Sequence, residues 1–142
     1  MKRELGDGFE LDDDPQRIDL DEVHRYLSEE SYWAAGRPRE EQAAMNAQAA
    51  RLVGLYRNGR QIGFSRTALV AGMRVAYLYD VYVLAEFRGR GLGEELVRET
   101  VDRGPFVDYR WLLDTTDAHA LYEKFGFGRP SERLMERARR RK

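Results

Sequence analysis

Apolar residues recur along the chain with two periods, one typical of helices and the other of strands. Apolar side chains repeat at helical spacing after Asp19 and Glu22, a pair that can cap the start of a helix. Helices are predicted for residues 20–27, 39–50, 94–103 and 118–125. Runs that favour strands occupy residues 8–11, 52–56, 61–70, 75–84 and 106–113.

Two turn signals connect the central strands. Both residues of Asn58-Gly59 accept a positive φ, which favours a hairpin, and Ala71-Gly72 supplies a second turn. Three antiparallel strands are therefore predicted. The strand, helix and strand of residues 75–113 form a crossover unit, so its second strand should run parallel to its first. The predicted fold is α/β, with a mixed antiparallel and parallel central sheet flanked by helices.

Composition limits the class of protein. The 142 residues, 42% of them hydrophobic, suit a single domain over residues 1–142. Because 24 Lys and Arg balance 25 Asp and Glu, bulk charge indicates neither a nucleic-acid nor a membrane partner. Without an apolar run of about 18 residues or an apolar signal core, the chain is expected to be cytoplasmic. Zero cysteines and two distant histidines suggest no metal site.

The most informative motif is the glycine-rich stretch of residues 88–93, between a predicted strand and a predicted helix. Glycines on alternate positions let backbone N–H groups converge on an anion at a helix start, although such a stretch can also be only a tight connection. The stretch does not match a P-loop, because no lysine follows the glycines. It does not match a dinucleotide-binding fingerprint either, because Glu94 occupies the position of the third glycine.

Two segments together carry a family resemblance. Arg88, Gly91 and Gly93 match an Arg-x-x-Gly-x-Gly pattern that resembles the pyrophosphate motif of the GNAT superfamily of N-acetyltransferases. Residues 120–127, with Leu121-Tyr122 before Gly126-Phe127, resemble a second signature of that superfamily. From about residue 51 to residue 127 the order of elements is also similar. The resemblance implies a GNAT-like fold, acetyl-CoA as co-substrate, and a final strand around residues 133–137, where periodicity alone permits a helix.

The resemblance also implies where acetyl-CoA binds. The glycine-rich loop would hold the pyrophosphate, and the edge of the preceding strand would hold the pantetheine amides where that strand splays from its neighbour at a bulge. The cofactor-binding residues so implied are Val81, Tyr82, Val83, Arg88, Gly89, Arg90, Gly91, Leu92 and Gly93.

The expected reaction is acetyl transfer to a primary amine by direct attack in a ternary complex. Tyr122 is the candidate that protonates the leaving thiolate, because a phenol remains protonated at neutral pH. The alternative is that Tyr122 is only a core residue. Asp80 is a candidate catalytic base, or equally a structural hydrogen-bond partner inside an apolar strand. The other candidates are Asp114 and a water chain that reaches Glu29 or Glu30. Tyr32 and Trp33 either line an acceptor pocket or cap the core.

Other functions are compatible with the same residues. The main alternative is a non-catalytic acyl-CoA-binding sensor or protein-interaction module with this fold. Nucleic-acid contact through the basic end, residues 137–142, is a weaker alternative to a solvated tail. The amine acceptor, a small molecule or a protein or peptide amine, is left open by the sequence, as is the choice between monomer and homodimer.

Overall fold

In the computed structural model, which describes residues 1–140, the strands of one six-stranded sheet follow one another in chain order. The strands are β1 (Lys2–Gly6), β2 (Phe9–Asp12), β3 (Arg51–Arg57), β4 (Arg60–Leu69), β5 (Val75–Val83) and β6 (Arg110–Leu112). Neighbours are antiparallel from β1 to β5, and β5 and β6 are parallel. The predicted mixed sheet is thus confirmed, with the parallel pair formed by the crossover unit.

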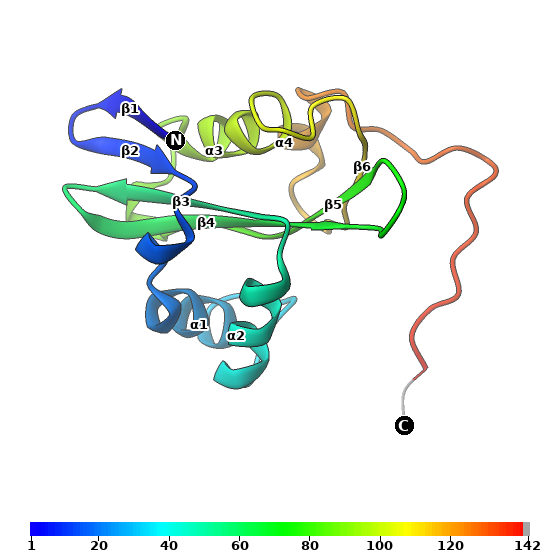
Figure 1. The fold of residues 1–142 in the computed structure, drawn as a ribbon, viewed down its shortest axis with the longest axis horizontal. Coiled ribbons are helices and arrows are strands. Elements are labelled where there is room, and N and C mark those ends of the chain that lie inside the picture. Colours follow the sequence, from blue (N-terminus) through cyan, green and yellow to red (C-terminus); the bar gives the residue numbers. More distant parts are fainter. Residues whose placement is uncertain (141–142) are drawn as a thin grey trace.

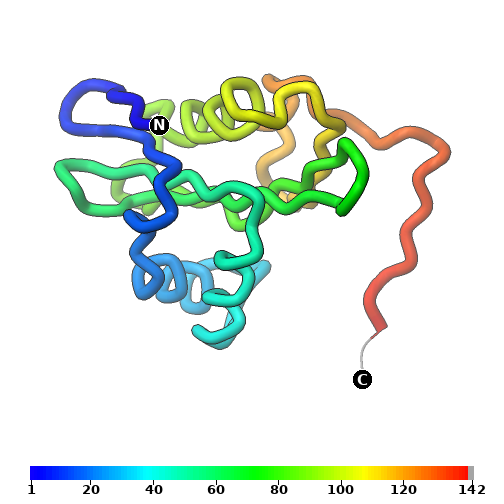
Figure 2. Tube along the Cα trace, viewed as in Figure 1, coloured from blue at the N-terminus to red at the C-terminus, as the bar shows by residue number. Residues whose placement is uncertain are grey.

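Helices cover both faces of the sheet. They are α1 (Leu20–Glu29), α2 (Arg39–Gln48), α3 (Leu92–Val101) and α4 (His119–Glu123), with short 3₁₀ helices η1 (Pro15–Arg17) and η2 (Ala85–Phe87). In Figures 1 and 2, α1 and α2 lie on one side of the sheet and α3 and α4 on the other. The Asp19 carboxylate accepts a hydrogen bond from the backbone N–H of Glu22 at 3.1 Å, so the predicted cap does begin α1.

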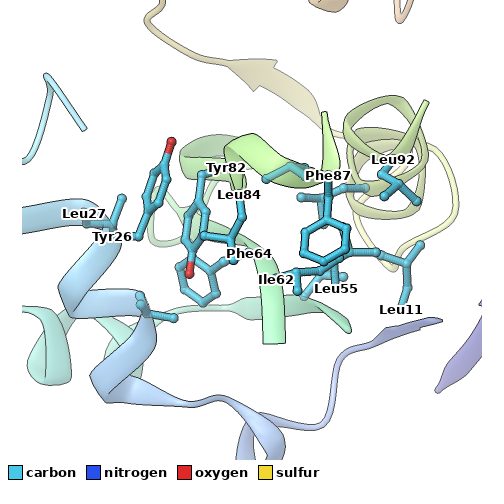
Figure 3. Close-up of a cluster of buried hydrophobic side chains, with 14 of the residues drawn as sticks. Leu11, Tyr26, Leu27, Leu55, Ile62, Phe64, Tyr82, Leu84, Phe87 and Leu92 are labelled. Atoms are coloured by element: carbon cyan, nitrogen blue, oxygen red, sulfur yellow. The ribbon is translucent and has the colours of Figure 1, made fainter. Parts of the chain in front are cut away.

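The core fills both sides of β3 and β4, whose residues are almost continuously buried. A strand covered on two faces loses the simple apolar and polar alternation, which explains the long apolar runs of the sequence. Figure 3 shows part of this core, where Tyr26 of α1 stacks on Tyr82 of β5 with ring centroids 3.9 Å apart. Leu27 and Phe64 lie beside this pair. The stack attaches α1 to the strand that carries the predicted site.

Two irregularities open the sheet on the side of β5. Between Phe64 and Arg66 of β4 the register shifts, and Asp80 on the opposite strand has a φ of 58°, in the left-handed region. β5 pairs with β6 only from Val75 to Tyr77. The two parallel strands then separate, so the rest of β5 faces open space. The bulge and the splay that the family resemblance implies are both present.

Several predicted boundaries need correction. The strand predicted for residues 106–113 is only β6, because Phe106 and Tyr109 close a turn through a 3.0 Å backbone hydrogen bond. β1 was not predicted, since four of its residues are exposed and lack an apolar pattern. α3 begins at Leu92, two residues earlier than predicted, inside the glycine-rich stretch.

The C-terminal segment departs most from the prediction. Residues 132–140 form neither the strand expected at 133–137 nor a helix. The segment runs away from the sheet in Figure 1, and Met135 is 91% exposed. A strand needs a partner for its backbone groups, and none lies alongside these residues in the described part of the chain. Residues 141 and 142 of the predicted basic tail lie outside the described residues. No helix within residues 1–140 is both long and apolar enough to cross a membrane.

Candidate active site

The glycine-rich loop ends at the start of α3 and leaves that helix end open. Gly89 and Gly91 have φ values of 80° and 77°, a conformation that residues with a Cβ adopt only with strain. Gly91 is the N-cap of α3, and no side chain caps the helix there. The first N–H groups of α3, which have no partner within the helix, therefore point out of the loop. An uncapped helix start of this kind favours an anion.

Gly93 differs from the other two glycines. It lies within α3, and a Cβ built at this position would meet no atom closer than 3.9 Å, the Cγ2 of Val83. The protein's own packing therefore gives no reason for glycine here. A missing Cβ at an unobstructed position in the first turn of α3 leaves room for a ligand to approach the backbone.

Arg88 fastens the loop to its surroundings. Its Nε donates to the carbonyl oxygen of Val83 at 3.0 Å, and its Nη2 donates to the hydroxyl of Tyr26 at 2.7 Å. One side chain thus joins the end of β5, the loop and α1. The sequence motif marks Arg88 as a residue of the site, but its partner Tyr26 could not be found from local sequence because the two are 62 positions apart.

Two cavities meet beside β5. One, of about 480 Å³, lies over the glycine-rich loop and is lined by Val81, Val83, Arg88 and Gly91 among others. We call it the loop chamber. The other, of about 490 Å³, lies over the splay between β5 and β6, and we call it the splay chamber. Six residues line both chambers: Tyr32, Trp33, Val81, Asp117, Ala118 and Tyr122. The site is therefore a single cleft with two arms.

Tyr122 stands where the two chambers join. It comes from α4, is 9% exposed, and packs edge-on against Phe127 with ring centroids 5.8 Å apart. Burial, followed by the negative charges that Tyr32 and Asp117 can carry, raises the pKa of its phenol to about 12. Among residues 1–140 no side chain or backbone group hydrogen-bonds to the Tyr122 hydroxyl. A protonated phenol without a protein partner is thus available to a ligand.

Asp80 sits at the bulge with its carboxylate fully engaged. Its Oδ2 accepts from Nε of Arg66 at 2.9 Å and from Nη1 of Arg37 at 3.0 Å, while Oδ1 accepts from Nε1 of Trp33 at 3.0 Å. The side chain is 1% exposed. Asp80 lies in the wall of the splay chamber. Three donors from three segments hold the bulge in its left-handed conformation.

The other candidate bases lie in different places. Asp114 lines the splay chamber and accepts a short hydrogen bond from the hydroxyl of Tyr77. Glu30 lines the loop chamber and is paired with Arg25 at 2.5 Å. Glu29 lines neither chamber. Sequence reasoning missed Arg66, although an arginine within an apolar strand is a signal that a buried carboxylate lies opposite.

The fold is an α/β fold with one two-armed cleft, and the hydroxyl of Tyr122 lies where the glycine-rich loop's chamber meets the second chamber. The model of the acetyltransferase (GNAT) family matches residues 17–127. The chain belongs to the GNAT family of acetyltransferases, and its enzyme class is acyltransferase. No sequence among the curated proteins matches it significantly.

Solved structures agree with this family. A protein from Xanthomonas campestris pv. campestris, described as belonging to the GNAT family, is 33% identical, with a TM-score of 0.83 and coverage of 92% of each chain. A GNAT family acetyltransferase from Brucella melitensis in complex with acetyl-CoA is 20% identical with a TM-score of 0.70, covering 87% of this chain and 85% of that one. The aminoglycoside N-acetyltransferase AAC(6')-Iy in complex with CoA is 21% identical with a TM-score of 0.67, covering 95% and 97%.

Proposed function

We propose that this protein is an N-acetyltransferase that moves the acetyl group of acetyl-CoA to a primary amine by direct attack within a ternary complex. The observation that carries the proposal is the junction of the two chambers at Tyr122. A cofactor held over the loop and an amine in the splay chamber would meet beside one protonated hydroxyl. The loop chamber then holds the acetyl donor and the splay chamber holds the acceptor.

The loop chamber fits acetyl-CoA on three counts. The start of α3 is uncapped and its N–H groups suit a diphosphate. The space beside Gly93 is unobstructed by protein atoms, so a bulky anion can reach the backbone. The edge of β5 beyond Tyr77 has no strand beside it within residues 1–140, which suits the amides of a pantetheine arm. Val81 and Val83 lie on this edge.

In this proposal one group of residues binds acetyl-CoA and another residue transfers a proton. The loop from Arg88 to Gly93 binds the diphosphate, and β5 orients the arm along its free edge. When bound, acetyl-CoA supplies a thioester-activated acetyl group. Tyr122 donates the proton of its hydroxyl to the departing sulfur, since its pKa of about 12 keeps it protonated at neutral pH. In this proposal the Val81 backbone N–H hydrogen-bonds the oxygen on which negative charge develops.

Asp80 has a positioning role in this proposal. Both oxygens of this carboxylate already accept hydrogen bonds from protein donors, namely Arg37, Arg66 and Trp33. Its role is to hold the bulge in place, which also fixes the direction of the Val81 N–H. The proton of the amine leaves through the carboxylates at the open side of the splay chamber or through water.

The test is release of free CoA. The chain has no cysteine, so a thiol reagent added to purified protein, acetyl-CoA and an amine reports only the CoA product. We expect amine-dependent release and a mass increase of the amine by one acetyl group. Acetyl-CoA binding without turnover across a broad amine panel would favour the alternative, a non-catalytic acyl-CoA sensor. Absence of acetyl-CoA binding would refute both the acetyltransferase and the sensor.

A further inference from the structure

Five aromatic side chains line the splay chamber: Tyr122 at its junction with the loop chamber, and four others that pack in two pairs. Tyr77 and Tyr79 stack with centroids 4.5 Å apart and an interplanar angle of 17°. Tyr32 and Trp33 meet edge to face at 5.1 Å. The four residues come from β5 and from the loop after α1, so they approach the chamber from two sides.

Hydrogen bonds at the polar ends of three of these side chains, those of Tyr77, Tyr32 and Trp33, fix the rings at the chamber. The Tyr77 hydroxyl donates to Asp114, and the Tyr32 hydroxyl accepts from the backbone N–H of Thr116 at 3.1 Å. Trp33 donates to Asp80 at 3.0 Å. Rings whose polar groups are already satisfied can offer only their apolar faces to a ligand. A flat apolar body is the shape that such faces accept.

The charges around the chamber favour a cation. Asp80 is paired with both Arg37 and Arg66, so its charge is already compensated, and Arg37 also lines the chamber. None of the ion pairs within residues 1–140 involves Asp114 or Asp117, and both line the chamber at its exposed side. An ammonium near these carboxylates is attracted by them and by the negative faces of the rings, whereas a carboxylate on the ligand is repelled.

Building on the proposed function, we propose that the acceptor is a small cationic amine that carries a flat apolar ring and no carboxylate. The ring would lie on the Tyr77–Tyr79 stack from the Tyr77 side, because the Arg66 guanidinium already lies over the Tyr79 ring at 4.6 Å from its centroid. It would also contact the Tyr32–Trp33 pair, and the ammonium would approach Asp114 and Asp117. Amino acids and acidic peptides are disfavoured because their carboxylates would be repelled by these two aspartates. Short alkylamines are disfavoured because they leave the aromatic faces uncovered.

Calorimetric titration tests the proposal without relying on turnover. Three probes are titrated into the full chain, with and without saturating free CoA, which has no acetyl group to transfer. Tyramine carries both the ring and the cation, tyrosine adds a carboxylate, and butylamine lacks the ring. We expect tyramine to bind at least about tenfold more tightly than either of the others, a difference within the range of one desolvated cation–π or charge contact.

Variants locate the contacts. The double substitution Asp114→Asn and Asp117→Asn should weaken tyramine binding about tenfold, whereas Asp108→Asn, in an exposed turn outside the chamber, should leave it unchanged. Tyr79→Leu should remove the preference for tyramine over butylamine. Thermal unfolding confirms that each variant is folded.

The outcomes separate this inference from the proposed function. Equal binding of tyrosine and tyramine, equal binding of butylamine and tyramine, or no binding of any probe at millimolar concentration would overturn the acceptor class. Acetyl-CoA-dependent acetylation of some other amine would in that case leave the proposed function standing. Selective tyramine binding without any acetylation would support the acceptor class and contradict the proposed reaction.

Discussion

Nε of Arg66 and Oδ2 of Asp80 lie 2.9 Å apart across β4 and β5, at the point where the register of the two strands shifts. Both side chains are almost wholly buried. The pair, with Arg37 as a second cation, holds a non-glycine residue at a φ of 58°, which is costly in an isolated chain. A buried charge cluster thus maintains the bulge that turns β5 toward the two chambers.

Removal of the Asp80 charge should destabilise the protein strongly. In Asp80→Ala, two buried guanidinium groups lose their counter-charge, so we expect a loss of about 3–5 kcal/mol in the free energy of unfolding. The matched control is Asp21→Ala, which breaks an exposed pair with Arg39 and should cost at most about 1 kcal/mol. Denaturant titration measures both. A cost for Asp80→Ala no greater than that of the control would show that the cluster does not hold the bulge.

Gly93 should separate cofactor binding from stability. Gly93→Ala adds a methyl group that meets no protein atom closer than 3.9 Å, and alanine favours helix over glycine by about 1 kcal/mol. We therefore expect unchanged or raised stability but at least about tenfold weaker acetyl-CoA binding, because the methyl group obstructs the start of α3. Gly128→Ala, also free of close contacts and remote from the loop, is the control. Calorimetry with CoA would contradict the proposal if both variants bound equally well.

The Tyr122 hydroxyl should matter for turnover and little for folding. Tyr122→Phe removes a proton donor that has no protein hydrogen bond within residues 1–140, so kcat should fall about 10²–10⁴-fold while the ring packing persists. Acetyl-CoA affinity should change less than about threefold, since the phenyl ring still lines the cleft. Unaltered kcat in this variant would remove Tyr122 from the mechanism.

Buried tyrosines should make the protein less stable at alkaline pH. Burial raises the pKa of Tyr56 and Tyr122 to about 12, above the ordinary value of 10.0 that these phenols regain in the unfolded chain. Below pH 10 these phenols are protonated in both the folded and the unfolded state, so the full stability of the folded state is present. Between pH 10 and 12 the unfolded chain loses the protons first, and stability falls as the pH rises. Each group should lower the unfolding free energy on the order of 1 kcal/mol per pH unit there. Denaturant titrations at several pH values between 10 and 12 measure this dependence. The unfolding free energy of Tyr56→Phe should fall less steeply with pH than that of the unmodified protein.

Local patterns predicted the elements of the site well, and contacts between distant residues only poorly. The period of apolar residues located three of the helices, helix-forming residues after Pro38 located α2, and the glycine-rich motif located the loop. All of these signals depend on the preferences of residues close together in the chain. The sequence left Asp80 between a catalytic and a structural role. Its partners Arg37 and Arg66 lie 43 and 14 positions away, and only packing brings them together. The expected final strand at residues 133–137 failed for the same reason, since strand pairing depends on a neighbour that composition cannot specify.

By itself, the sequence determined an α/β chain with a glycine-rich turn before a helix and a tyrosine in a second family motif. These features are local, and residues within a few positions of one another set them. The tertiary structure alone decided that the pairing of β5 with β6 stops at Tyr77, that Tyr122 stands between two chambers, and that five aromatic side chains line one of them. Those relationships arise from hydrogen bonds and packing between segments far apart in the chain, which no local pattern of residues encodes.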